Sequence, residues 1–159
     1  MKTILIIGGC GTGKTWLMKE LIKSEKAKPQ KMGLISWNKF RNTLVLGKYT
    51  GKTFDGGDAL SMAVAKDFPK LRKYQETMKI NIIAEGDRFT NSTFIGIFNP
   101  YIIKIDNDGS WGRNNRKSSQ TEQHIKRIQS RVNNTKYNIA VKDSAEALKT
   151  VKKLINENT

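Results

Sequence analysis

The stretch Gly8-Gly9-Cys10-Gly11-Thr12-Gly13-Lys14-Thr15 decides the expected fold, because it matches the pattern G-x-x-x-x-G-K-[ST]. The apolar run at residues 4–7 predicts a buried strand before it, and residues 16–22 predict a helix after it. Glycines let the chain curl so that backbone N–H groups point inward at a polyphosphate, and the helix adds the positive end of its dipole. All eight residues are therefore predicted to bind a nucleotide. Lys14 is expected to reach its β- and γ-phosphates, and Thr15 to offer its hydroxyl to Mg²⁺.

Length and composition predict a single domain over residues 1–159, with one substantial core. No apolar run approaches the ~18 residues that a membrane span needs, so we expect no membrane association and a cytoplasmic location. One cysteine, Cys10, and one histidine, His124, form no Cys/His zinc cluster and allow no internal disulfide.

Net charge is the second strong signal. The chain has 29 Lys and Arg against 14 Asp and Glu, a formal charge of +15. An enzyme that acts on free nucleotides needs a few cations in its site, whereas this excess favours a large polyanion such as nucleic acid. A lysine-rich solvated surface with no partner is the alternative explanation.

Alternating strand and helix patterns predict an α/β protein. We expect a three-layer fold, a five-stranded parallel sheet flanked by helices, with right-handed crossovers and an arginine-rich lid at about 107–133. Residues 23–31 are expected to be a charged connector and residues 43–49 an edge extension outside the nucleotide core. The other strands are expected at 1–8, 33–37, 80–84, 101–106 and 137–141, and the helices at 13–24, 68–78, 120–132 and from 143 onward.

Phosphoryl transfer requires positioning and charge compensation, and several acidic residues are candidates for these roles. Glu85 follows a predicted strand, where open α/β sheets bind ligands. We expect Glu85 or Asp55 to act with Thr15 at Mg²⁺. Asp58 is the expected base for an attacking hydroxyl and Asp87 its rival, although Asp58 also fits a helix N-cap.

Arginines are expected to stabilise charge on the transferred group. Arg88 and Arg113 are the candidates for that role, and Arg116 is expected to contact the nucleotide. Arg127 and Arg131 lie four residues apart on one helix face, which is either functional or simply exposed. Trp111, in a polar loop, could stack on a base.

Four segments of the chain resemble the P-loop nucleoside and nucleotide kinases. They are residues 8–15, called here the phosphate loop, the turn Phe54-Asp55-Gly56-Gly57-Asp58, the run Glu85-Gly86-Asp87-Arg88 and the Arg113/Arg116 lid. A narrower resemblance is to the bacteriophage 5-hydroxymethyluracil DNA kinases. It rests on residues 46–64, on Glu85-Gly86-Asp87-Arg88 and on Arg131-Val132-Asn133-Asn134. This resemblance implies a P-loop kinase fold, ATP and Mg²⁺. It implies phosphorylation of the hydroxymethyl group of a modified pyrimidine in phage DNA, in the host cytoplasm. Gly57 departs from the Gly-Thr-Asp form of the turn, in which a Thr stands at its position.

Two other functions fit the sequence. One is a small-molecule kinase for a nucleoside or nucleoside monophosphate, and the other is a P-loop ATPase or DNA-binding regulator without an acceptor. A GTPase is disfavoured, because Asn38-Lys39-Phe40-Arg41 lacks the aspartate of the guanine-reading Asn-Lys-x-Asp motif. If the acceptor is a paired base, we expect it to be flipped out of the duplex. Oligomeric state stays open.

Overall fold

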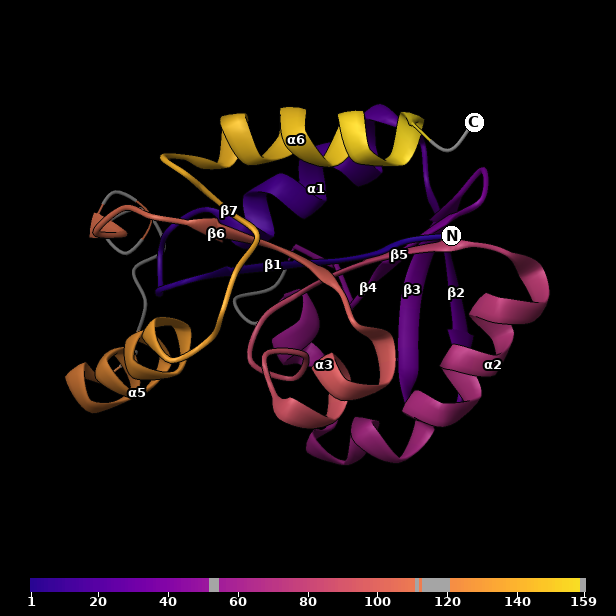
Figure 1. The fold of residues 1–159 in the computed structure, drawn as a ribbon, viewed down its shortest axis with the longest axis horizontal. Helices are drawn as coiled ribbons and strands as arrows, with labels where there is room; N and C mark the ends of the chain where they lie inside the picture. The colour runs from indigo at the N-terminus through magenta and orange to yellow at the C-terminus, as the bar shows by residue number, and fades with distance from the viewer. Residues whose placement is uncertain (52–54, 111, 113–120, 158–159) are drawn as a thin grey trace.

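The computed structural model describes residues 1–51, 55–110, 112 and 121–157, and its strands form one seven-stranded sheet of order β2-β3-β4-β5-β1-β6-β7. Helices α1 and α6 lie on one face of this sheet, and α2, α3 and α5 lie on the other (Figure 1). The fold is therefore three-layered α/β. Its elements are β1 (Thr3–Gly8), α1 (Lys14–Ser24), β2 (Lys28–Met32), β3 (Ile35–Phe40), β4 (Thr43–Leu46), the 3₁₀ turns η1 (Gly57–Ala59) and η2 (Met62–Asp67), α2 (Phe68–Met78), β5 (Asn81–Glu85), α3 (Ser92–Phe98), β6 (Tyr101–Ile105), α5 (Glu122–Asn133), β7 (Ile139–Val141) and α6 (Ser144–Asn156).

The expected five-stranded, all-parallel sheet is wrong, because the sheet has seven strands of mixed direction. β4, β5, β1, β6 and β7 run parallel, whereas β3 is antiparallel to both β2 and β4. β2 arises from the predicted charged connector. It is an exposed edge strand, where Pro29 is tolerated because an edge leaves backbone donors unpaired. β4 is not an edge extension, since it pairs between β3 and β5.

Each face of the sheet has its own apolar core, which explains why β1 is a continuous apolar run. Leu5 packs with the cluster beneath α2 and α3, and Ile6 packs with the cluster beneath α1 and α6. Both residues are fully buried. Consequently β1 lies between the two apolar cores, and its carboxyl end leads directly into the loop at residues 8–15.

The local helix signals were partly right. α2 spans the predicted residues 68–78, and Asp143 caps α6 by accepting a hydrogen bond from Glu146 N at 2.8 Å. α5 begins at Glu122 rather than at residue 120, and its N-cap is Thr121, whose hydroxyl accepts a hydrogen bond from His124 N. Asp58 is not a helix N-cap, because it lies inside η1.

Within the described residues, every helix is too short or too polar to cross a lipid bilayer.

Candidate active site

Residues 8–15 connect the carboxyl end of β1 to the first turn of α1, as the motif predicts. Gly11 and Gly13 have φ angles of 79° and 102°, values that other residues rarely adopt. The Lys14 ammonium group folds back onto this loop and donates hydrogen bonds to Gly8 O at 2.7 Å and to another loop carbonyl at 3.0 Å. The loop is therefore a tight turn with a cation held against it.

Two distant segments touch this loop closely. A Cβ atom added to Gly9 would overlap the side chain of Gln129 from α5, and one added to Gly112 would overlap the Gly11 carbonyl. A side chain at position 112 would therefore meet the loop backbone, whereas one at position 9 would require only the flexible Gln129 side chain to move. Gln129 and Gly112, which both fall within residues 107–133, thus lie against residues 8–15.

Glu85 ends β5 beside the phosphate loop, because β5 pairs directly with β1. Its side chain is almost fully buried. Its Oε1 accepts hydrogen bonds from Tyr49 OH at 3.2 Å, Gly57 N at 3.4 Å and Thr15 Oγ1 at 3.5 Å. Two residues expected at the metal, Thr15 and Glu85, are thus neighbours.

The surroundings of Glu85 disfavour its ionised form. Burial raises the pKa of the Glu85 carboxyl above its ordinary value; the Lys14 charge lowers it, and the Asp58 charge raises it again. Burial, followed by the Glu85 charge, also raises the pKa of Tyr49. A cation placed beside Glu85 would favour the carboxylate, which makes this position suitable for a metal ion.

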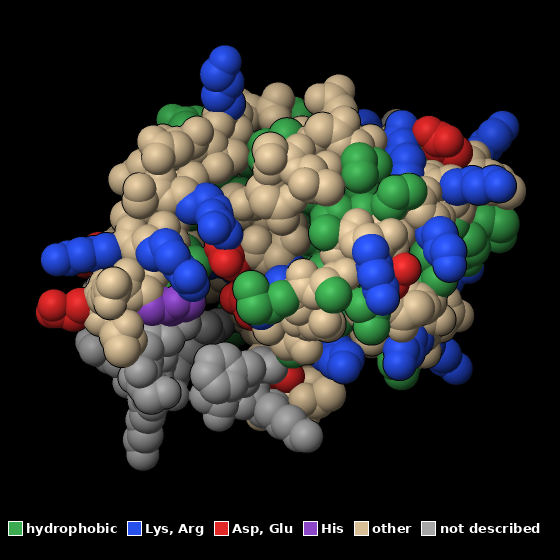
Figure 2. Space-filling model, turned by 90° about the horizontal axis from the view of Figure 1, so that it is seen from below, with side chains coloured by type: hydrophobic (Ala, Val, Ile, Leu, Met, Phe, Trp, Pro, Cys, Tyr) green, Lys and Arg blue, Asp and Glu red, His purple; other side chains and the backbone are tan. Residues whose placement is uncertain are grey.

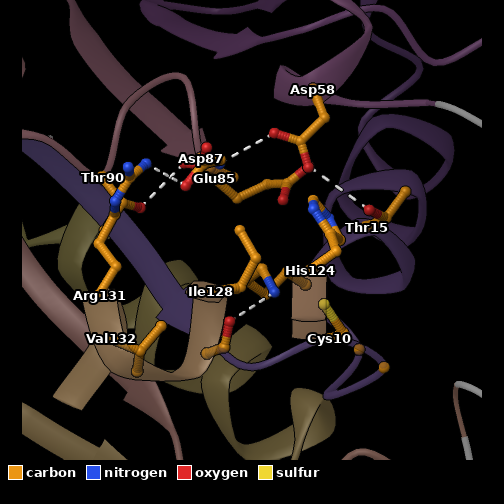
Figure 3. Close-up of a pocket in the computed structure, with 15 residues that line it drawn as sticks. Cys10, Thr15, Asp58, Glu85, Asp87, Thr90, His124, Ile128, Arg131 and Val132 are labelled. Carbon is orange, nitrogen blue, oxygen red and sulfur yellow. Dashed lines mark hydrogen bonds and ion pairs between the residues drawn. The ribbon is translucent and has the colours of Figure 1, made fainter. Parts of the chain in front are cut away.

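Asp58 from η1, Asp87 from the loop after β5 and Arg131 from α5 come together (Figure 3). Asp87 N donates a hydrogen bond to Asp58 Oδ1 at 2.9 Å, and Arg131 from α5 forms an ion pair with Asp87. Arg131 thereby ties α5 to the loop that follows β5. The two candidate bases lie side by side, but Asp87 is engaged by the arginine.

The loop after β5 is anchored by a cluster of buried aromatic side chains. Phe89, two residues after Asp87, is fully buried. Its ring centroid lies 5.1 Å from that of Phe94 and 5.9 Å from that of Phe68. The buried Phe89 ring anchors the chain just after Arg88, and the Asp87 N–H donates to Asp58, so the Asp87 backbone has a fixed place beside Asp58.

Two adjoining pockets meet at these residues. The first, called here the loop pocket, contains the phosphate loop and the acidic residues. The second, called the side pocket, is shared with η1, η2 and α5. Asp58, Asp87, His124 and Arg131 line both. The loop pocket is lined in addition by Gly8, Cys10, Gly11, Gly13, Lys14, Thr15, Glu85, Gly86, Thr90, Ile128 and Val132, and the side pocket by Met62, Val64, Ala65, Arg88, Asn91 and Arg127.

Asp55 lies elsewhere, although it was an expected metal ligand. Among the described residues that line the loop pocket, Asp55 is absent. It forms an ion pair with Lys19 at 2.9 Å and accepts hydrogen bonds from Thr50 N and Gly51 N. Burial would raise the pKa of Asp55, but these bonds outweigh it and lower the pKa from 3.8 to about 2. Asp55 therefore stabilises the turn at residues 50–51.

Asp55→Asn is expected to lower the free energy of unfolding by about 2 kcal/mol at pH 7. The native pKa lies below the unfolded value, so the stabilisation is present above pH 3.8 and is lost as the pH falls toward about 2. Urea unfolding from pH 7 to pH 2 measures both effects, with the exposed Asp106→Asn as control. Equal stability of Asp55→Asn and the native chain at pH 7 would contradict this role.

Gly57 is explained by the structure, because a side chain there has no room. An added Cβ would overlap the Glu85 carbonyl oxygen and lie 2.9 Å from the Phe89 ring. The departure from Gly-Thr-Asp thus allows η1 to pack directly on the end of β5.

Gly57→Ala is expected to destabilise the fold by about 1–3 kcal/mol, since backbone or a buried ring must shift. Thermal unfolding measures the loss. Gly96→Ala is the matched control, because nothing lies within 4 Å of a Cβ at this helical position. It should be neutral or slightly stabilising. Equal melting temperatures for the two variants would show that η1 has room to move.

The remaining predicted residues fall into two groups. Arg88 lines the side pocket, and its Nε donates to Leu60 O at 3.2 Å; it is not among the described residues that line the loop pocket. Arg113, Arg116 and Trp111 lie outside the described residues.

Sequence reasoning missed Tyr49 and left Arg131 undecided. Tyr49 lies in the segment 43–49, which the sequence predicts to be an edge extension, so no sequence signal points to a contact between its hydroxyl and Glu85. Arg131 had a usable signal, because its spacing from Ile128 and Val132 puts it next to the face of α5 that packs inward.

Among the described residues, no three His, Cys, Asp or Glu side chains form a ready-made metal cluster. No protein-family model matches the chain, and no curated protein sequence matches it significantly.

Proposed function

We propose that this protein is an ATP-dependent kinase that transfers the γ-phosphoryl group to the hydroxymethyl group of 5-hydroxymethyluracil in DNA. One observation carries the kinase proposal: the phosphate loop, buried Glu85 and the pair Asp58 and Asp87 line a single pocket. A phosphate site next to a carboxylate able to receive a proton is what phosphoryl transfer to an alcohol requires.

On the donor side, the loop amides and Lys14 would hold the ATP phosphates. Lys14 now hydrogen bonds to loop carbonyls, and phosphate oxygens would provide a stronger, charged partner. Thr15 and Glu85 would hold Mg²⁺, which when bound neutralises charge on the phosphates. Tyr49 orients Glu85 by donating to its Oε1.

On the acceptor side, Asp58 is the proposed base. Its described hydrogen bond comes from Asp87 N to Oδ1, so the other carboxylate oxygen can receive a proton. In the proposed step the acceptor oxygen forms a bond to the γ-phosphorus, and the bond between that phosphorus and the bridging oxygen of ADP breaks. The hydroxyl proton passes to Asp58. Arg131 is paired with the neighbouring Asp87, so its positive charge would offset negative charge on the reacting groups beside Asp58.

The side pocket is the proposed entrance for the acceptor. It joins the loop pocket at Asp58 and Asp87, and it adds apolar Met62 and Val64 to the cations Arg88 and Arg127. Apolar surface suits a base, and cations suit the phosphates that flank it. The charge of +15 and the sequence resemblance support DNA over a free nucleotide.

The decisive experiment supplies γ-labelled ATP with plain DNA, DNA containing 5-hydroxymethyluracil, and free nucleosides and nucleoside monophosphates. We expect label only in the modified DNA, recovered as the phosphorylated nucleoside after digestion. Label in free nucleotides but not in DNA would replace this proposal by a small-molecule kinase. ATP hydrolysis unaffected by every acceptor would point to an ATPase instead.

A further inference from the structure

A third cavity on the face that carries α3 and α5 is not used by the chemistry above. It is an open groove of about 1030 Å³, called here the α3–α5 groove. One side is formed by Asn91, Ser92 and Ile95 at the start of α3, and the other by the end of α5 and residues 134–138. Its position next to the candidate active site raises the question of what it holds.

The groove opens into both pockets of the candidate site. Thr90 and Arg131 line the groove and the loop pocket. Asn91 and Arg127 line the groove and the side pocket. A long molecule lying in the groove would therefore pass directly beside Asp58 and Asp87.

The groove has the chemistry of a phosphate backbone site. Its charged lining residues are Arg127, Arg131 and Lys136, and no carboxylate is among the described residues that line it. The rest of its polar lining consists of hydroxyl and amide side chains, and Lys and Arg side chains are prominent over the surrounding face (Figure 2). Cations, hydroxyls and amides are the groups that contact phosphate and sugar in protein–DNA complexes.

An exposed aromatic ring also lines the groove. Tyr137 is 50% exposed, and the Lys104 ammonium lies 5.3 Å from its ring centroid. A half-exposed ring flanked by cations suits stacking on a base or sugar, with the neighbouring phosphates held by Lys136.

We propose that the α3–α5 groove binds the backbone of the DNA strand whose modified base enters the candidate active site. This inference rests on the proposed function, because it makes DNA the acceptor. Arg131 then has two roles. It pairs with Asp87 inside the candidate site, and it contacts the strand where the groove meets the loop pocket. Lys136 and Tyr137 contact nucleotides away from the reacting base.

Lys136→Glu tests the groove, because Lys136 lines the groove and is exposed to solvent. The matched control is Lys149→Glu on α6, which makes the same charge change on the opposite face of the sheet (Figure 1). Binding of a labelled DNA duplex is measured by fluorescence anisotropy across salt concentrations. We expect Lys136→Glu to weaken binding about tenfold and to reduce the salt slope by about 1, and Lys149→Glu to leave both nearly unchanged.

Equal weakening by both variants would overturn the proposal, because it would mean a diffuse positive field rather than a groove. Failure of the native protein to bind DNA would overturn it as well. Lys136→Ser, a milder change, is measured in parallel and should weaken binding less than Lys136→Glu. If Lys136→Glu is selectively weak but modified DNA is never phosphorylated, the groove stands and the proposed acceptor fails.

Discussion

Lys14→Ala is expected to lower kcat for phosphoryl transfer by at least about 10²–10³-fold, the usual cost of removing one group that stabilises developing charge. Lys14 is the cation held against the phosphate loop, and it lines the pocket that contains Glu85 and Asp58. It belongs to neither apolar core, so the variant should fold.

The measurement is single-turnover phosphorylation of modified DNA at saturating ATP, together with thermal unfolding. Lys23→Ala is the matched control, since Lys23 is an exposed lysine on the same helix. Near-normal turnover of Lys14→Ala would remove the phosphate loop from the mechanism and leave the pocket without a donor site.

The parts of the structure that are encoded locally were predictable from sequence. The loop at residues 8–15, the helix at 68–78 and the Asp143 cap each depend on residues within a few positions of one another. Such signals survive folding because glycine geometry, helical periodicity and capping bonds are short-range.

The pairing of the strands was not predictable in the same way. Residues 28–32 are charged and contain Pro29, so they show no alternation of apolar and polar residues. They form β2 because the Gly33 turn brings them against β3, with Met32 opposite Ile35. Residues 43–46 look like any short strand, and only the fully formed sheet places them beside β5. In both segments the place of the strand in the sheet is decided by the strand it pairs with, and not by its own residues.

The candidate site shows the same division. Glu85 and Asp87 could be found because they follow a buried strand, and such strand ends collect ligand-binding groups. Asp55 and Asp58 sit in one turn and look equivalent in sequence. The structure separates them, since Asp55 is bonded to Lys19 and the 50–51 turn, while Asp58 contacts Asp87 N. Tertiary contacts, not motif membership, distinguish a stabilising carboxylate from a candidate base.

Asp58→Asn is expected to lower kcat by about 10²–10⁴-fold with little change in ATP affinity, as for removal of a general base. Asparagine has the same shape and keeps an oxygen that can accept the bond from Asp87 N, so the turn should be retained. What it loses is the ability to take the acceptor proton. The measurement is single-turnover transfer at saturating DNA, with ATP affinity determined separately.

Asp87→Asn is the matched comparison, because it makes the same replacement, of one carboxylate oxygen by an amide NH₂ group, in the neighbouring side chain. It weakens the ion pair with Arg131, which links α5 and the α3–α5 groove to the site. We therefore expect it to raise KM for DNA more than it lowers kcat. The reverse result, with turnover retained in Asp58→Asn and lost in Asp87→Asn, would make Asp87 the base and reduce Asp58 to a residue that holds the Asp87 backbone. Both side chains line the same two pockets, and the Asp87 backbone N–H donates to the Asp58 carboxylate. The contrast between kcat and KM decides between them because, among the described ion pairs, Arg131 is paired with Asp87 and not with Asp58.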